Sequence, residues 1–478
     1  MSNVTASGAR QRIDSLLDAN SFVEIGGLIT ARSTDFNITA KETPSDGVIT
    51  GYGVIDGNLV YVYSQDASVL GGTIGEMHAK KIVRLYDIAM KTGAPIIGLV
   101  YCAGLRLLEA TDALNGFGEI YMAQAKASGV IPQITAILGT CGGGMALVPV
   151  LTDFTFMEET KAKLFVNSPN ALSGNIDSKL DTASAGFQSE EVGIVDVLGS
   201  ESEILAQMRA LISILPGSFE DDSVCEACSD DLNRSCANLE NCIGDTAILL
   251  SQISDNSTFF EMKKSYGKDM VTALIKLNGT TVGAVANRSE IYDSEGSLTE
   301  SLEPVISARG AEKAAEFVQF CDAFSIPVLT VTNVKGFKAT KCSEKKMAKA
   351  AAKLTYAFAN ATTPKVNLIT GQAYGSAYLT MNSKSIGADM VYAWPNAQIG
   401  MMDAKAAAKI MYGDTDAVTI NEKAAEYATL QNSVMSAARR GYVDTIIEPE
   451  DTRKYVIGAF EMLFSKRENR PDKKHGTV

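Results

Sequence analysis

The stretch ILGTCGGGMALVP, residues 137–149, places four glycines within six positions, between an apolar run and a segment compatible with a helix. Glycine packs little and costs conformational entropy in a strand. Such backbone freedom is useful where bare N–H groups must face a ligand. Because the stretch matches neither GxxxxGK[ST] nor GxGxxG, it does not indicate a nucleotide-phosphate loop. It predicts a buried strand that ends in a glycine turn and enters a helix.

A similar pattern returns 232 residues later, in ITGQAYGSAY at 369–378. At this shift Pro95 falls on Pro327 and Pro132 on Pro364. Further echoes join LLDANSFVEIG to SDNSTFFEM, and GIVDVL to GYVDTI, at similar separations. An internal repeat of this length indicates duplicated domains. We therefore expect an N-terminal domain at 1–215, an acidic cysteine-containing linker at 216–244 and a C-terminal domain at 245–478.

Each half alternates short apolar strands with helical stretches. PIIGLVY and IPVLTVT are typical strands, and KKMAKAAAKLTYAFANA is the clearest helix. This alternation is typical of α/β units and argues against a sandwich or an all-helical bundle. A strand that ends in glycine occurs once in each half, at 139–144 and 371–375.

A glycine turn from a strand into a helix leaves backbone N–H groups at the positive end of the helix dipole. Such amides can hold a phosphate, or the oxygen of an enolate formed from a thioester. In the second use they form an oxyanion hole. Glycine at such junctions also serves tight packing alone, but two turns at equivalent positions favour a function. The sequence thus predicts two oxyanion sites.

The bulk composition narrows the remaining possibilities. The 478 residues carry a net charge of −13, which argues against a nucleic-acid partner. The polar N-terminus does not resemble a signal peptide, and no apolar run approaches the length of a membrane span. Eight cysteines without a secretion signal favour the cytoplasm. Four of them, at 225, 228, 236 and 242, have a spacing that zinc could use, but we expect exposed, reduced thiols there and no bound metal.

Other catalytic chemistry finds little support. The chain has two histidines, His78 and His475, and no G-x-S-x-G elbow, so a Ser-His-Asp triad is not expected. His78 lies in an amphipathic helical pattern and is better explained as a helix-face residue than as a base. The proton carrier is therefore a carboxylate, a tyrosine or the substrate itself.

Several stretches taken together resemble the carboxyltransferase subunits of biotin-dependent acyl-CoA carboxylases, of the propionyl-CoA carboxylase β-subunit type, and those of sodium-pumping acyl-CoA decarboxylases. The resemblance covers essentially the whole chain. The stretches that carry it are RIDSLLDANSFVEI, VYVYSQDASVLGGTIGEMHAKKI, SGVIPQITAILGTCGGGMALVPVLTDFTFM, FVQFCDAFSIPVLTV, LTYAFANATTPKV, AYGSAYLTMNSKSIGADMVYAWPNAQI and RPDKKHG.

The resemblance implies two tandem crotonase-like domains of β-β-α superhelical type, dimers or hexamers, and a site shared by two subunits. It implies that carboxybiotin releases carbon dioxide, that the biotin anion takes a proton from the thioester, and that the enolate captures the carbon dioxide. Because the chain has no biotin-attachment motif, biotin would come on a separate carrier protein. The other partner would be a biotin carboxylase or a membrane decarboxylase subunit.

Positions carried over from the family place the oxyanion donors at the N–H groups of Gly143 and Gly144 in the N-half, and of Ser376 and Ala377 in the C-half. Ser376 stands where the family usually has glycine. The remaining positions bind substrate in the family, and in this sequence they are Gly71, Gly72, Ala103, Gly104, Arg106 and Gly336.

The pocket motifs depart from the family pattern. Tyr101 stands where the family has an aspartate, the D-x-P-G-F motif reads NVKGF at 333–337, and V-M-G-P-E-G-A reads MMDAKAA at 401–407. These changes suggest an altered acyl-CoA substrate or relaxed selection on catalysis. A catalytically weakened structural paralogue is therefore an alternative to the carboxyltransferase. A crotonase-like hydratase or hydrolase is a third class, and only Glu109 suggests a carboxylate for it.

Overall fold

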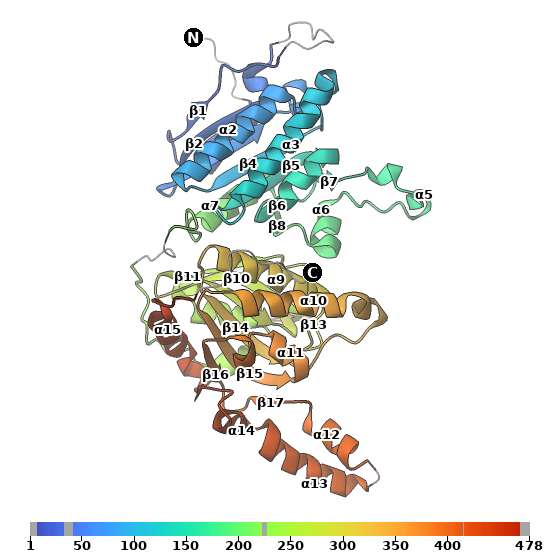
Figure 1. Ribbon diagram of the computed structural model, residues 1–478, viewed down its shortest axis with the longest axis vertical. Coiled ribbons are helices and arrows are strands. Elements are labelled where there is room, and N and C mark those ends of the chain that lie inside the picture. Colours follow the sequence, from blue (N-terminus) through green and yellow to red (C-terminus); the bar gives the residue numbers. More distant parts are fainter. Residues whose placement is uncertain (1–6, 33–41, 222–226, 414, 469–478) are drawn as a thin grey trace. The chain divides into compact units, whose positions relative to one another are not determined.

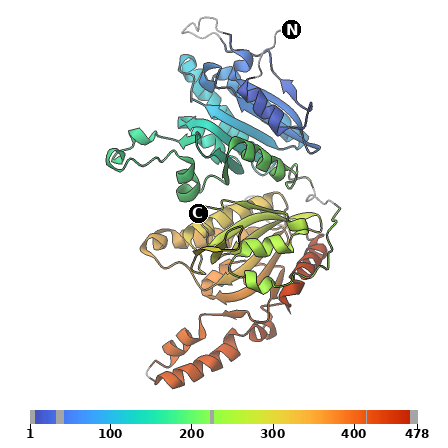
Figure 2. The same ribbon diagram turned by 180° about the vertical axis from the view of Figure 1, so that it is seen from behind.

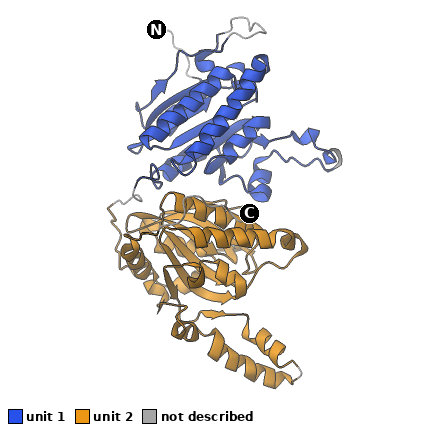
Figure 3. Cartoon of the chain, in the orientation of Figure 1, with its two compact units in different colours: residues 1–222 blue, residues 223–478 orange. Residues whose placement is uncertain are grey.

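The computed structural model describes residues 7–32, 42–221, 227–413 and 415–468. The chain divides into two compact units, residues 1–222 and 223–478, which are coloured separately in Figure 3. Each unit has its own cluster of buried apolar side chains. None of the described helices is long and apolar enough to cross a membrane.

Unit 1 is built on one mixed sheet of eight strands (Figure 1). The first three strands in the sheet pair antiparallel, and the others pair parallel. The strands follow the order β1 (Val23–Ile25), β2 (Val48–Ile55), β3 (Asn58–Gln65), β4 (Ile96–Cys102), β5 (Gln133–Gly142), β6 (Phe154–Glu158) and β8 (Val197–Gly199), with β7 (Lys163–Phe165) beside β5.

Unit 2 repeats this sheet strand for strand. Here too the first three strands are antiparallel and the others parallel. The order is β9 (Phe259–Met262), β10 (Met270–Leu277), β11 (Thr280–Asn287), β14 (Val328–Val334), β15 (Lys365–Tyr374), β16 (Met390–Ala393) and β18 (Thr445–Ile446), with β17 (Gln398–Gly400) beside β15. A hairpin of β12 (Glu290–Tyr292) and β13 (Leu298–Ser301) is separate from this sheet. The structure thus contains the internal repeat that the sequence predicts, in an α/β architecture.

Helices cover both faces of each sheet. On one face, α2 (Glu76–Thr92) lies beside α3 (Ala110–Ala127) in unit 1, and α9 (Ala308–Ala323) beside α10 (Lys341–Asn360) in unit 2 (Figure 1). Figure 2 shows the opposite faces, and the helices there are α1 (Gly8–Leu16), α7 (Glu201–Ile212), α8 (Thr246–Ile253) and α15 (Thr452–Leu463). The buried positions of α10 recur at helical spacing, which explains why one stripe faces the sheet.

A buried lysine joins the first large helix to the sheet in each unit. The Lys81 Nζ of α2 donates to the carbonyls of Ser45 and Val48. The Lys313 Nζ of α9 donates to three carbonyls, including that of Met270 at 2.8 Å. Burial lowers the pKa of each ammonium to about 8. The two lysines hold corresponding strand starts, β2 and β10, in the repeat.

One arm of unit 2 extends away from its sheet. It contains α12 (Ala404–Met411) and α13 (Ala417–Tyr427), and no described residue of α13 is buried (Figure 1). Ile410 and Val418 are 73% and 67% exposed. Met411, next to Ile410 in α12, is also 58% exposed, and clustered exposed apolar side chains mark surfaces that a second protein covers.

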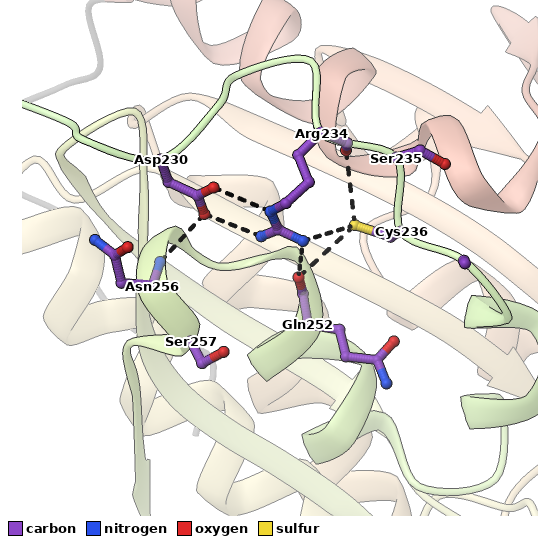
Figure 4. Close-up of a pocket in the computed structure, with 8 residues that line it drawn as sticks. Asp230, Arg234, Ser235, Cys236, Gln252, Asn256 and Ser257 are labelled. Atoms are coloured by element: carbon purple, nitrogen blue, oxygen red, sulfur yellow. Dashed lines mark hydrogen bonds and ion pairs between the residues drawn. The ribbon is translucent and has the colours of Figure 1, made fainter.

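Residues 227–244 of the expected linker pack on unit 2. Its other described residues, 216–221, belong to unit 1, where the Phe219 N–H donates to the Val130 carbonyl at 3.1 Å. The Cys236 N–H donates to the carbonyl of Glu450 at 2.9 Å. The Arg234 guanidinium pairs with Asp230 (Figure 4). It also donates to the carbonyl of Ser254 at 3.2 Å. The expectation of exposed thiols is wrong for Cys236, which is buried at 4% exposure by this packing, while Cys228 and Cys242 are half-buried. Cys225 lies outside the described residues.

Candidate functional site

The two glycine turns have the same backbone form. In unit 1, β5 ends at Gly142, and a 3-10 turn (Gly143–Ala146) leads into α4 (Leu147–Val150). In unit 2, β15 ends at Tyr374 and α11 (Gly375–Thr380) follows. Gly143 and Gly375 have φ values of +63° and +59°, which explains why both positions are glycine. In both turns the next residue is exposed and the one after it is buried.

The first N–H groups of a helix have no acceptor within that helix, and the N–H groups of these two turns are in this position. Among the described residues, no side chain accepts a hydrogen bond from the N–H of Gly143, Gly144, Ser376 or Ala377. A methyl group added at Gly143 would meet nothing within 4 Å. Each unit therefore presents amide N–H groups at a helix start that no described side chain occupies, and the position of a Cβ at Gly143 is open space.

Ser376 fits its position without backbone strain. The positive φ falls on the preceding residue, Gly375, while Ser376 lies within the helix. The glycine that the family usually has at this position is thus not needed for the turn, and the serine keeps its N–H.

The predicted substrate-binding loops of unit 1 lie together next to the end of β4. The Ala103 N–H donates to the Gly71 carbonyl at 3.2 Å, and the Ile74 N–H donates to the Gly104 carbonyl at 2.9 Å. Gly72 has a φ of +66°, and a Cβ there would lie 2.3 Å from the carbonyl oxygen of Tyr101. The two loops therefore form one layer that only glycine permits at position 72.

The buried side chain of Arg106 is hydrogen-bonded to this layer. Its side chain is 4% exposed, and its Nη1 donates at 2.6 Å to Asp46 and at 2.6 Å to Glu109. Its Nη2 donates to the Thr73 carbonyl at 2.9 Å. Both terminal nitrogens of this buried guanidinium are bonded to protein acceptors, while its Nε has no hydrogen-bond partner. The structure therefore gives Arg106 the contacts of a positioning residue and not those of an open phosphate ligand. The second Glu109 oxygen accepts the Glu76 N–H at 2.6 Å, so this carboxylate is also occupied.

A buried chain of hydrogen bonds fixes the end of β4, and sequence reasoning missed it. The Nδ1–H of His78 donates to the carbonyl of Asp46 at 2.9 Å, because a carbonyl can only accept. His78 Nε2 then accepts from the Gln65 amide at 3.2 Å, and Gln65 Oε1 accepts the Tyr101 N–H at 3.1 Å. Burial lowers the pKa of His78 to about 3, so the ring stays neutral. His78 is a structural residue, in agreement with the expectation that it is not the base.

At the end of its own sheet, unit 2 repeats the part of this hydrogen-bond chain that runs through side-chain amides. We call this part the amide clamp. Asn287 Oδ1 accepts the Asn333 N–H at 3.2 Å, and Asn333 Oδ1 accepts the Gln372 N–H at 2.9 Å. The signal in the sequence is an amide side chain at the last position of both β3 and β11. The clamp connects the carboxyl end of β14 to β15 just before the glycine turn.

The remaining positions that the sequence analysis names are Gly336 and Asp403 in unit 2 and Tyr101 in unit 1. Gly336 follows β14, and its carbonyl accepts the Ile306 N–H at 3.0 Å. Asp403 caps α12, since its carboxylate accepts the N–H groups of Lys405 and Ala406. Its departure from the family pattern thus has a local structural use. The Tyr101 ring fills space that Gly139 leaves and lies 5.6 Å from the Arg12 guanidinium.

A separate pocket of about 430 Å³ lies in unit 2 and is polar (Figure 4). Its Arg234 is already paired with Asp230 at 3.0 Å, so the pocket has no uncompensated cation for an anionic ligand. Within the described ranges no group of three or more His, Cys, Asp or Glu side chains is placed to hold a metal ion.

The family model for the carboxyl transferase domain matches residues 6–478. The chain belongs to the carboxyl transferase family. It is 37% identical to the methylmalonyl-CoA decarboxylase subunit alpha of Propionigenium modestum, over 98% of this chain and 92% of the relative. It is 40% identical to a putative propionyl-CoA carboxylase beta chain of Bacillus subtilis, over 98% of this chain and 93% of the relative.

A solved structure of transcarboxylase 12S, a hexamer with hydrolysed methylmalonyl-CoA bound, superimposes with a TM-score of 0.91 at 34% identity. It covers 98% of this chain and 92% of the transcarboxylase chain. The resemblance and the crotonase-like α/β fold are thereby confirmed. The chain is a biotin-dependent acyl-CoA carboxyltransferase.

Proposed function

We propose that this carboxyltransferase moves a carboxyl group between biotin, borne on a separate carrier protein, and a short-chain acyl-CoA such as methylmalonyl-CoA or propionyl-CoA. The observation that carries the proposal is the pair of matched turns, each with a positive-φ glycine and with N–H groups that no described side chain occupies. The substrate class is supported by relatives whose names include methylmalonyl-CoA and propionyl-CoA.

The residues present fit two oxyanions. In the proposal, the N–H groups of Gly143 and Gly144 hold one negative oxygen, and those of Ser376 and Ala377 hold the other. Preorganised amides of this kind stabilise charge that develops on a thioester oxygen when its α-carbon loses a proton. Biotin, when bound, supplies the carboxyl group and the proton acceptor. The protein orients the thioester and holds its oxygen, while the neutral, buried His78 stays outside the chemistry.

Partners and assembly follow from the same proposal. The chain works with a biotin carrier and either a biotin carboxylase or a membrane decarboxylase subunit, in the cytoplasm, and self-associates into dimers or hexamers. The transcarboxylase structure is a hexamer, which supports self-association. The exposed apolar residues of α12 and α13 provide a surface for it.

The test measures carboxyl transfer from methylmalonyl-CoA to free biotin by the purified chain. Ser376→Pro removes one proposed donor N–H, whereas the control Ser376→Ala keeps it. We expect a loss of about 10² to 10³ in kcat for the proline variant, and near-wild-type activity for the alanine variant. Gly143→Ala places a methyl group in front of the unit 1 turn and should also lower kcat.

The same assay decides between this proposal and the structural paralogue. The exchange of the family aspartate for Tyr101 is the observation that favours the paralogue. Absence of transfer by folded wild-type protein, with melting temperatures of all variants unchanged, would favour it. Full activity of a folded Ser376→Pro variant would remove the oxyanion role from that residue.

A further inference from the structure

The loop after β14 and the first part of α10 carry an unusual concentration of lysine. In a chain of net charge −13, seven lysines lie within 19 residues. Six of them are exposed and Lys353 is half-buried. We call this surface the lysine patch, and it consists of Lys335, Lys338, Lys341, Lys345, Lys346, Lys349 and Lys353.

The segment of the lysine patch contains one acidic residue, the exposed Glu344 in the first turn of α10. Across the described parts of both units, no carboxylate forms an ion pair with any of its members. Lys341, Lys345 and Lys349 follow one another at i+4 spacing, an arrangement that destabilises a helix when the charges are alike. Lys341 is also the first residue of α10, where the positive end of the helix dipole disfavours a cation.

The equivalent helix of the repeat shows that the fold does not require these charges. α3 holds the same place in unit 1, and its only lysine is Lys126, in its last turn. It also has the acidic residues Asp112 and Glu119. Because the two helices share a position in the repeat but not a charge, the lysine patch points to a partner and not to packing.

The lysine patch begins beside the turn proposed as an oxyanion site. Val334 of β14 pairs with Ala373 of β15, two residues before Gly375. Lys335 follows at once, and the Lys338 N–H donates to the Ile306 carbonyl at 2.9 Å, which fixes the loop. A partner bound along α10 would therefore lie next to the Ser376 and Ala377 donors.

We propose that the lysine patch is the docking surface for an acidic face of the biotin carrier protein. The inference rests on the proposed function, because that function brings biotin on a separate protein. A helix face is convex, whereas small-molecule sites are concave. The row from Lys341 to Lys353 extends over roughly 18 Å at 1.5 Å per residue, which suits a protein surface. The large exposed apolar side chains of the described chain include none from α10, so the features of a membrane-inserting helix are missing there.

The experiment compares two triple variants of the full chain. Lys345→Gln, Lys346→Gln and Lys349→Gln neutralise the centre of the patch. The control neutralises three exposed lysines of unit 1, Lys126, Lys161 and Lys179. Both variants are assayed with a recombinant biotinylated carrier domain from the same organism and, separately, with free biotin.

With the carrier domain, the patch variant should show a KM for the carrier raised by about tenfold or more, an unchanged kcat and a weaker dependence on salt. With free biotin, its KM for methylmalonyl-CoA should equal that of wild type. The control variant should match wild type in every assay. Direct binding of the carrier domain by biolayer interferometry should show the same loss for the patch variant alone.

An unchanged KM for the carrier, together with unchanged binding, overturns the inference and leaves the proposed function intact. A raised KM for methylmalonyl-CoA with free biotin also overturns it, because the patch would then bind CoA phosphates. Loss of binding to phosphatidylglycerol vesicles without loss of carrier binding assigns the patch to a membrane and overturns it too. If the wild-type protein is inactive, that result contradicts the proposed function and not the inference. Binding of the carrier domain, measured by biolayer interferometry, then still tests the docking surface.

Discussion

Gly72 lies in the loop after β3 with a φ of +66°, and the carbonyl oxygen of Tyr101 lies where a Cβ would stand, at 2.3 Å. Gly72→Ala should therefore combine backbone strain with a clash, and lower the free energy of unfolding by about 3 kcal/mol. Gly57→Ala is the matched control, since its φ is +82° but no atom lies within 4 Å. It should cost about 1 kcal/mol. Urea unfolding of both variants measures the difference, and equal losses would contradict the clash.

His78 gives the protein a defined sensitivity to acid. Its pKa is lowered to about 3 by burial, against an ordinary value of 6.5. The unfolded chain therefore takes up a proton that the folded chain refuses between these values. Stability should fall as the pH drops from about 6.5 toward 3, with a contribution of at most about 1.4 kcal/mol per pH unit from this one group.

The measurement is the pH dependence of urea unfolding in wild type and in His78→Asn. The asparagine cannot titrate but has an amide that can donate to the Asp46 carbonyl. The variant should lose the His78 part of the slope below pH 6.5 and keep the wild-type slope above it. Parallel curves through the acid range would show that His78 does not carry this dependence.

At the residue scale, the sequence identifies the turn glycines but not the polar residues that support them. Gly143 and Gly375 stand out because each follows an apolar strand directly, where a residue with a side chain would pack better unless the backbone must turn. Arg106 looks like an open substrate ligand in the sequence, because its partner Asp46 is 60 positions away in the chain and the ion pair exists only after folding. Sequence analysis does not identify the roles of Lys81 and Lys313 for the same reason, because the backbone carbonyls that accept their hydrogen bonds follow no sequence pattern.

The first turn of α10 offers a test at the scale of a single element. Lys341 begins the helix behind the Thr340 cap, with a cation at the positive end of the dipole. Lys341→Glu should stabilise the protein by about 0.3–1 kcal/mol and at the same time weaken binding of the carrier domain. Lys341→Gln removes the charge without adding an anion, so its stability should fall between those of wild type and Lys341→Glu. Thermal unfolding checks the order, and a destabilised Lys341→Glu variant would contradict it.

Elements are predicted well where the repeat marks them. β5 and β15 begin and end one repeat shift apart, at Gln133–Gly142 and Lys365–Tyr374. β4 and β14 do the same, at Ile96–Cys102 and Val328–Val334. The hairpin of β12 and β13 has no counterpart among the described strands of unit 1, so a comparison of the chain with itself cannot find it.

At the scale of the whole molecule, the arm of α12 and α13 should matter only when subunits meet. Ile410 and Val418 are so exposed that Ile410→Glu with Val418→Glu should leave the folded subunit intact. If the arm lies in the proposed self-association interface, two buried charges should shift the protein to smaller species in light scattering. Leu298→Glu, at a position 52% exposed on β13, is the control. An unchanged assembly would exclude the arm from the interface.

The duplication of the whole chain is the feature that the sequence predicts most completely, because it rests on many weak matches at one spacing. Segment 227–244 shows the limit of that reasoning. Its acidic composition suggests a solvated connection, yet Arg234 and Cys236 attach it to unit 2 through carbonyls of Ser254 and Glu450. Composition describes a segment's preference for water, while these contacts depend on acceptors that other elements present.

Lys81 and Lys313 also provide a built-in reporter for each unit. Both amines are hidden in the native state, at 4% and 2% exposure, whereas four lysines of α10 are exposed, namely Lys341, Lys345, Lys346 and Lys349. An amine-reactive ester should label α10 within the first minutes and reach the hidden pair only when the surrounding unit opens. Mass spectrometry of the two peptides would then time the opening of each half of a single chain separately, with no engineered probe.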